Sequence, residues 1–92
     1  MGETEVGTGL RAELRAYVEE AFLYLHPDVE LRDEDQFLEL GVIDSLGFVE
    51  LVEEVQSRYG IAVDALEITE ENFGSIDALV AFVERRRAEE AT

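Results

Sequence analysis

The sequence predicts a small all-α domain, a four-helix bundle made of three longer helices and one short helix. Three segments repeat apolar residues at helical spacing, at roughly 9–25, 45–59 and 76–83. A length of 92 residues suits one domain, and a hydrophobic fraction of 47% is enough for one modest core. We therefore expect a flexible lead over residues 1–8, a folded domain over residues 9–88 and a short tail over residues 89–92.

The first predicted helix covers roughly residues 9 to 25, where the apolar positions are Leu10, Leu14, Tyr17, Val18, Ala21, Phe22 and Leu25. Pro27 ends this helix, because the residue before a proline is pushed out of the helical region. Residues 27–43 are expected to form a long ordered connection with room for one short helical turn. Its apolar anchors are Leu31, Phe37, Leu38, Leu40, Val42 and Ile43.

The second predicted helix runs from about residue 45 to residue 59, and Gly60 follows it as a typical left-handed C-terminal cap. On a helical wheel, one arc is apolar and is expected to be buried: Phe48, Val49, Leu51, Val52, Val55 and Tyr59. A separate arc carries Glu50, Glu53 and Glu54, with Ser57. Leu46 falls among these glutamates and not in the core, so its position predicts a contact point for a partner.

The last third of the chain is expected to hold one short helical turn and the final long helix. Asp64 is a predicted N-terminal cap for a helical turn that starts at residue 65, and residues 69–74 are predicted to form a loop. Ser75 caps the final helix, whose apolar face is Ile76, Leu79, Val80, Phe82 and Val83. The basic residues 85–87 are expected to complement the negative end of this helix's dipole.

The composition limits the possible partners. A formal net charge of −16 argues against nucleic acid, because phosphate backbones would be repelled, and it disfavours anionic membranes. No apolar run approaches the ~20 residues of a membrane span, no signal peptide is evident, and a cytoplasmic location fits. A partner with a basic patch would be attracted, although excess acid can also serve only solubility. With no cysteine in the chain, any thiol chemistry must come from a cofactor.

Asp44 and Ser45, at the start of the second helix, are the one candidate site for chemistry. Asp44 alone reads as a helix cap that accepts hydrogen bonds from the first turn. The same turn suits phosphate, because its amides point outward and the helix dipole is positive there, so Ser45 can be esterified at little steric cost. A Ser-His-Asp hydrolase is disfavoured, since nothing brings His26 to Ser45. Residues 32–36 lack the ligand pattern of a calcium loop, and no metal site is expected.

These residues resemble the acyl carrier protein family. The similar stretches are residues 40–46 (Leu-Gly-Val-Ile-Asp-Ser-Leu), 49–52, 59–61 and 73–79, and the resemblance covers roughly residues 10–87. It implies a carrier without catalytic activity, to which a phosphopantetheinyl transferase attaches 4′-phosphopantetheine from coenzyme A at Ser45. The thiol of that arm would hold an acyl group as a thioester. In the family, the residue at Asp44 assists transferase recognition and magnesium positioning during the modification.

The resemblance also implies that partners dock on the acidic second helix, at Leu46, Glu50, Glu53 and Glu54. The expected partners are the transferase, an acyl-loading enzyme (a ligase or an acyltransferase) and a downstream synthase with a basic docking patch, and the carrier is expected to be a monomer. The predicted pathway is polyketide, other secondary-metabolite or fatty-acid biosynthesis.

Gly47 and Phe48 depart from the acidic and small polar residues that are common after the motif in fatty-acid carriers. The order Ser-Leu-Gly at residues 45–47 is closer to D-alanyl carriers. A D-alanyl or other amino-acyl carrier of a ligase-dependent pathway is therefore the first alternative. The second is an acidic helical adaptor that carries nothing, in which Asp44 and Ser45 only cap a helix.

Overall fold

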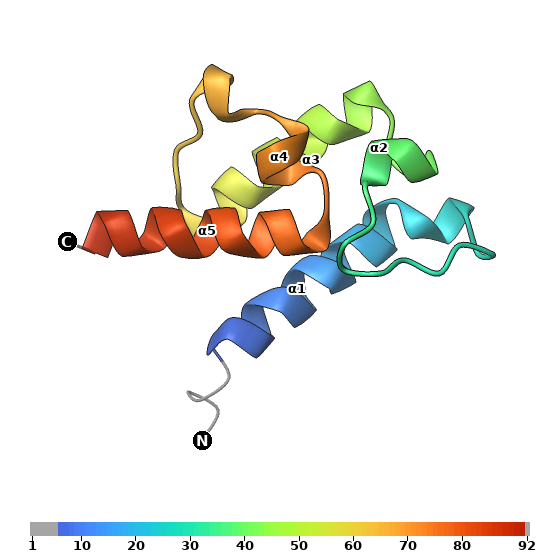
Figure 1. The fold of residues 1–92 in the computed structure, drawn as a ribbon, viewed down its shortest axis with the longest axis horizontal. Helices are drawn as coiled ribbons and strands as arrows, with labels where there is room; N and C mark the ends of the chain where they lie inside the picture. The colour runs from blue at the N-terminus through green and yellow to red at the C-terminus, as the bar shows by residue number, and fades with distance from the viewer. Residues whose placement is uncertain (1–5, 92) are drawn as a thin grey trace.

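The computed structural model describes residues 6–91, and every regular element in this range is helical (Figure 1). Three long helices, α1 (Val6–Ala21), α3 (Ser45–Tyr59) and α5 (Ile76–Ala91), make up most of the fold. Two one-turn helices, α2 (Phe37–Leu40) and α4 (Glu70–Phe73), and two 3₁₀ turns, η2 (Leu23–Leu25) and η3 (Ala65–Glu67), lie in the connections. The predicted all-α bundle with three longer helices is confirmed, with more short helical turns than the one expected.

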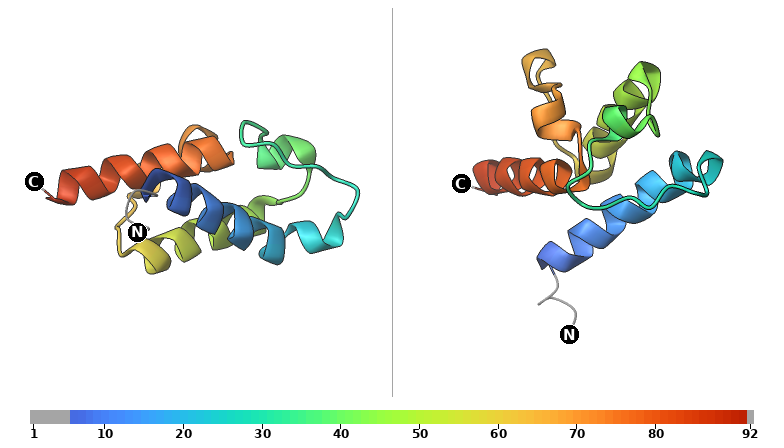
Figure 2. Two further views of the ribbon diagram at one scale, coloured as in Figure 1. Left: turned by 90° about the horizontal axis from the view of Figure 1, so that it is seen from below. Right: turned by 45° about the vertical axis from the view of Figure 1, so that its right-hand side comes forward.

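The long helices enclose one apolar core, and α5 lies against both α1 and α4 (Figure 2). Three phenylalanines from different helices meet inside it: the ring centroid of Phe73 lies 4.9 Å from that of Phe82 and 6.5 Å from that of Phe48. Such aromatic pairs add roughly 0.5–1.5 kcal/mol beyond the burial of their area. This cluster therefore joins α3, α4 and α5, and it fixes α3 from the inside.

The first helix differs from its prediction at both ends. It begins at Val6, three residues earlier than expected, and it stops at Ala21. Phe22 (φ −127°, ψ −38°) breaks the helical geometry, and the chain continues as η2. Leu25, which was predicted to face the core, is 67% exposed as a result. Residues 1–5 of the predicted lead lie outside the described residues.

The connection between α1 and α3 is ordered by apolar anchors. Four of the six predicted anchors are buried, namely Leu31, Phe37, Val42 and Ile43, and Leu38 packs against the core. Leu40, the last residue of α2, is 42% exposed instead. Gly41 then adopts φ 76°, and this left-handed residue turns the chain toward α3.

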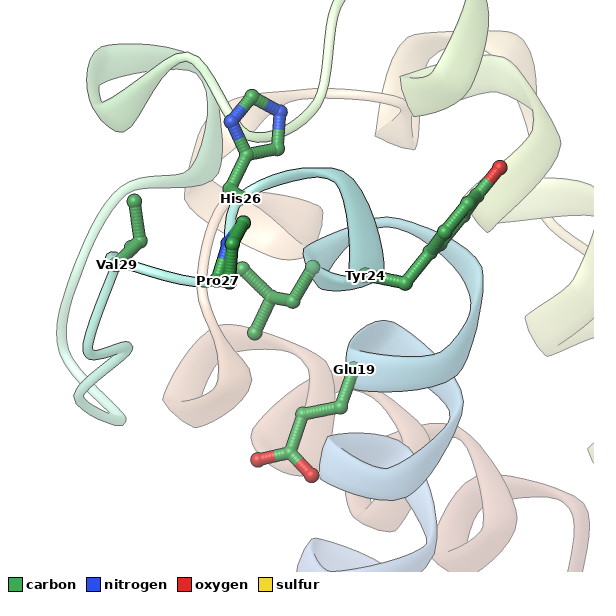
Figure 3. Close-up of a pocket in the computed structure, with 6 residues that line it drawn as sticks. Glu19, Tyr24, His26, Pro27 and Val29 are labelled. Carbon is green, nitrogen blue, oxygen red and sulfur yellow. The ribbon is translucent and has the colours of Figure 1, made fainter.

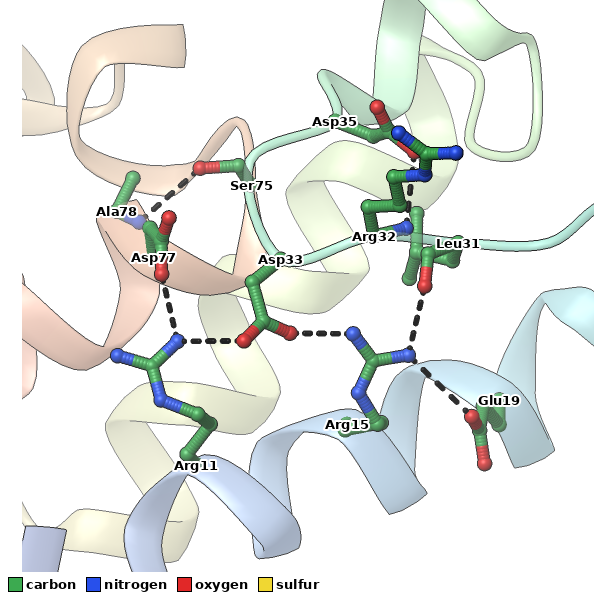
Figure 4. Close-up of polar contacts among 10 residues, drawn as sticks. All are labelled: Arg11, Arg15, Glu19, Leu31, Arg32, Asp33, Asp35, Ser75, Asp77 and Ala78. Carbon is green, nitrogen blue, oxygen red and sulfur yellow. Dashed lines mark hydrogen bonds and ion pairs between the residues drawn. The ribbon is translucent and has the colours of Figure 1, made fainter. Parts of the chain in front are cut away.

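A cluster of two arginines and two aspartates, Arg11, Arg15, Asp33 and Asp77, pins the middle of this connection (Figure 4). Arg11 Nη1 donates to Asp33 Oδ2 at 3.0 Å and to Asp77 Oδ1 at 2.6 Å. Arg15 pairs with the other oxygen of Asp33. These arginines hold the pKa of Asp33 below its ordinary value, the hydrogen bond from Arg15 contributing most. We call this group the Asp33 cluster; it ties the connection to α1 and to the start of α5.

The segment between α3 and α5 contains one confirmed and one wrong prediction. Asp64 caps η3 as expected, because its Oδ1 accepts from the Leu66 N–H at 3.3 Å and its own N–H donates to Glu67 at 3.0 Å. The predicted loop over residues 69–74 is wrong, since it contains α4. Thr69 caps this helix by accepting from the Asn72 N–H at 3.3 Å, and threonine followed by two glutamates is a typical signal for the start of a helix.

The final helix begins as predicted, and the Oγ of Ser75 accepts from the Ala78 N–H at 3.1 Å. The explanation offered for residues 85–87 is wrong, because α5 continues to Ala91 and its last turn has no basic residue. Arg86 instead pairs with Glu67 and donates to the Ala62 carbonyl. This arginine fastens the η3 segment to α5.

Candidate functional site

Ser45 is the first residue of α3 and is exposed. Asp44 precedes it in an extended conformation (φ −94°, ψ −176°), and its Oδ1 accepts from the Gly47 N–H at 2.8 Å. The Asp44 carbonyl accepts from the Phe48 N–H, also at 2.8 Å. The predicted cap is confirmed, so one carboxylate oxygen of Asp44 is directed onto the helix, beside the exposed serine.

The approach to Ser45 is rigid on both sides. Val42 and Ile43, directly before Asp44, are 5% and 2% exposed. Gly47 and Phe48, directly after the exposed pair Ser45 and Leu46, are buried again. The short exposed segment from Asp44 to Leu46 is therefore held between two buried anchors. It presents the serine hydroxyl at the surface, at the positive end of a helix of 15 residues.

The outer face of α3 combines apolar and acidic side chains. Leu46 is 69% exposed, as its place on the wheel predicted. Val49 is 48% exposed, so its assignment to the core is wrong; it lies one turn after Leu46, at the edge of the apolar arc, and no neighbouring helix covers it. Glu50 and Glu53 are exposed as well. We define the outer face of α3 as Leu46, Val49, Glu50 and Glu53.

Glu54 differs from the other two glutamates. Its Oε2 accepts from Arg58 Nη2 at 2.8 Å, and the Arg58 guanidinium lies 5.3 Å from the centroid of the Tyr17 ring on α1. Burial raises the pKa of Tyr17, and the negative charges of Glu54 and Glu50 raise it further. Glu54 is therefore part of the contact between α3 and α1, and its charge is balanced at short range.

The far end of α3 is fixed by Tyr59 and by Gly60. The Tyr59 hydroxyl donates to Glu13 Oε1 at 2.9 Å. Burial, together with this hydrogen bond to a carboxylate, raises the pKa of Tyr59 to about 12. Gly60 adopts φ 63° and ends the helix with the predicted left-handed cap. The C-terminal end of α3 is thus fixed against α1.

His26 lies on a different part of the surface. It lines an open pocket of about 380 Å³ at the end of α1, together with Glu19, Leu23, Tyr24, Pro27 and Val29 (Figure 3). Among the described residues, no hydrogen bond joins the His26 side chain to Ser45. The structure therefore does not bring together the pair that a serine hydrolase would need.

Two further features are absent from the described residues 6–91. No group of three or more His, Cys, Asp or Glu side chains in this range is arranged to hold a metal ion. No helix in this range is both long and apolar enough to cross a membrane.

Comparison with known proteins gives a family and a set of relatives. A protein-family model described as "Phosphopantetheine attachment site" matches residues 12–83. The D-alanyl carrier protein of Streptococcus suis (strain 05ZYH33) is 39% identical over 61 residues, which are 66% of this chain and 76% of that protein. The D-alanyl carrier protein of Streptococcus sanguinis (strain SK36) is 34% identical over 79 residues, which are 85% of this chain and 95% of that protein.

Proposed function

Because this chain belongs to the phosphopantetheine attachment-site family, we propose that Ser45 is the residue to which its 4′-phosphopantetheine group is attached. Members of this family carry the group covalently and act as carriers without catalysis of their own. The observation that carries the proposal is the exposed serine at the first position of α3, inside the matched range of residues 12–83.

The local structure fits such an attachment. The Ser45 hydroxyl is at the surface, and the free amides and dipole of the first turn favour a phosphodiester there. During modification, the Ser45 oxygen forms a bond to the phosphorus next to the pantetheine of coenzyme A. The bond from that phosphorus to the oxygen of the second phosphate breaks, adenosine bisphosphate leaves, and the hydroxyl proton passes to the transferase or to solvent. When bound, the group supplies a flexible arm with a thiol for a thioester.

The cargo proposed for this carrier is a small amino-acyl group, such as D-alanyl. The relatives are named as D-alanyl carrier proteins, and the order Ser45-Leu46-Gly47 supports the same choice over a polyketide or fatty-acid chain. A ligase that activates the amino acid is then the loading partner.

The outer face of α3 is the proposed docking surface for the transferase and the ligase. It places an apolar side chain, Leu46, beside Ser45, with Val49, Glu50 and Glu53 along the same helix. The described residues form no ion pair with Glu50 or Glu53, so both charges are available to a basic partner. Glu54, which Arg58 already neutralises, is expected to contribute less to docking.

The attachment is tested by mass spectrometry of the intact protein. Co-expression with a broad-specificity phosphopantetheinyl transferase is expected to add the mass of one phosphopantetheine to the wild type and to Ser57→Ala. Ser57 is an exposed serine on the same helix, so this variant is a matched control. Ser45→Ala is expected to remain unmodified. A wild type without added mass, or a modified Ser45→Ala, would refute the proposal.

The cargo is tested separately, on protein purified from its native host. We expect the added mass of phosphopantetheine plus a small amino-acyl group, and mild hydroxylamine should release only the latter. A long acyl chain in its place would refute the proposed cargo and leave the carrier function standing.

A further inference from the structure

We propose that Gly47 positions Ser45, because its missing side chain lets Phe22 seat directly against the first turn of α3. This inference rests on the proposed attachment at Ser45. Gly47 is the third residue of α3 and is buried, although the two residues before it are exposed. A glycine inside a helix costs roughly 1 kcal/mol relative to alanine, so its presence in this turn requires a physical reason.

The reason lies in what a side chain would meet. A Cβ atom at residue 47 would lie 3.0 Å from Cε1 of Phe22, 3.1 Å from Cγ2 of Ile43 and 3.3 Å from Oδ1 of Asp44. All three distances are shorter than ordinary van der Waals contact between such atoms. By contrast, a Cβ at Gly9, in α1, would meet no atom within 4 Å.

The three neighbours differ in their freedom to move. Ile43 is 2% exposed and belongs to the packed core, so it has no space to retreat. Asp44 holds the cap to the Gly47 N–H at 2.8 Å, and rotating its carboxylate away would break that hydrogen bond. Phe22 lies at the joint between α1 and η2, where the helix is already interrupted, and its ring makes an edge contact with Tyr17 at 6.0 Å.

A side chain at residue 47 therefore separates the end of α1 from the first turn of α3. Ser45 lies in that turn, two residues before Gly47, and Asp44 caps it. Separation displaces the serine hydroxyl and loosens the cap, whereas Glu50 and Glu53 lie at least one turn further along the helix. The contact between Phe22 and Gly47 thus sets the geometry of the attachment site, and the two glutamates contribute to docking separately.

The experiment measures kcat and KM of a phosphopantetheinyl transferase, with coenzyme A, on the apo carrier. Gly47→Ala is expected to lower kcat roughly tenfold with KM nearly unchanged, because a misplacement of about 1 Å can cost up to ~100-fold in rate. Gly9→Ala is the matched control, another glycine-to-alanine change within a helix, and its kcat and KM are expected to equal those of the wild type.

The decisive comparison repeats Gly47→Ala in a Phe22→Ala background, where the ring no longer opposes the added methyl group. There we expect Gly47→Ala to lower kcat by a smaller factor than in the wild-type background, because only the contacts with Ile43 and Asp44 still oppose the methyl group. An equal loss in both backgrounds would overturn the positioning role, as would a Gly47→Ala variant that reacts like Gly9→Ala. A wild type that is never modified would instead refute the proposed function.

Circular dichroism establishes that each variant is folded at the assay temperature. Should Gly47→Ala fail to fold, Phe22→Trp tests the same contact from the other side, because it enlarges the ring and keeps the glycine. Its kcat is expected to fall by a similar factor, and an unchanged kcat would overturn the proposal.

Discussion

Replacing Asp33 by asparagine removes the central charge of the Asp33 cluster and leaves the backbone in place. The carboxylate serves two arginines at once, with 35% of its side chain exposed against 39% for Arg11 and 29% for Arg15. Partly exposed ion pairs of this kind contribute about 0.2–1 kcal/mol each, so the two pairs together contribute about 1 kcal/mol. In a domain of this size, that loss lowers the melting temperature by about 4–8 °C.

The matched control is Glu34→Gln, which removes the same charge one residue further along the chain. The Glu34 side chain is exposed and forms no ion pair with the described residues. Thermal unfolding of both variants at pH 7 and low salt gives the comparison, and strong salt should reduce the difference between them. Since the folded-state pKa of Asp33 is lowered, its contribution is present above the unfolded value near ~3.9 and is lost as the pH falls through the folded one. Equal melting temperatures for the two variants at pH 7 would refute the stabilising role of the cluster.

Three further predictions concern α3. Glu53→Lys is expected to slow association with the transferase at low salt by roughly tenfold. Glu84→Lys changes the net charge by the same amount on α5 and should have little effect. Equal association rates for the two variants would mean that the acidic face serves solubility and not docking. The raised pKa of Tyr59 predicts a stability contribution that is complete below pH ~10 and declines as the pH rises toward about 12. The decline should therefore be smaller in Tyr59→Phe, where the raised pKa of Tyr17 still contributes, as denaturant titration at high pH would show. Leu46→Ala is expected to leave the free energy of unfolding unchanged within ~0.5 kcal/mol, because the side chain is 69% exposed, whereas Leu51→Ala should cost about 2–5 kcal/mol at a position that is fully buried.

Local signals in the sequence predicted the ends of the helices well. Asp44, Asp64 and Ser75 act as N-terminal caps, and each accepts a backbone hydrogen bond from two or three residues further on. Gly60 ends α3 in a left-handed conformation. Such contacts depend only on neighbours in sequence, which is why residue type and spacing are enough to predict them.

Features that depend on distant residues were not predictable in this way. The Asp33 cluster joins Arg11 to Asp77 across 66 residues, and no periodicity indicates such a pair. Val49 lies at the edge of the apolar arc, where burial depends on whether another helix covers it, and none does. The burial of Gly47 against Phe22 likewise requires the break between α1 and η2. The regular spacing of apolar residues predicted one continuous helix through this point.

All seven basic residues of the chain are arginines, and they are the positions after which trypsin can cleave the chain. Trypsin cleaves only after lysine and arginine, and six of its seven target bonds follow residues within α1, α3 or α5. The seventh bond joins Arg32 to Asp33, in the connection between α1 and α3. Asp33 forms ion pairs with Arg11 and Arg15. Cleavage there would separate α1 from Ser45. The rate of cleavage after Arg32 therefore reports how often the Asp33 cluster opens. The natural sequence supplies this cleavage site, so no engineered label is needed.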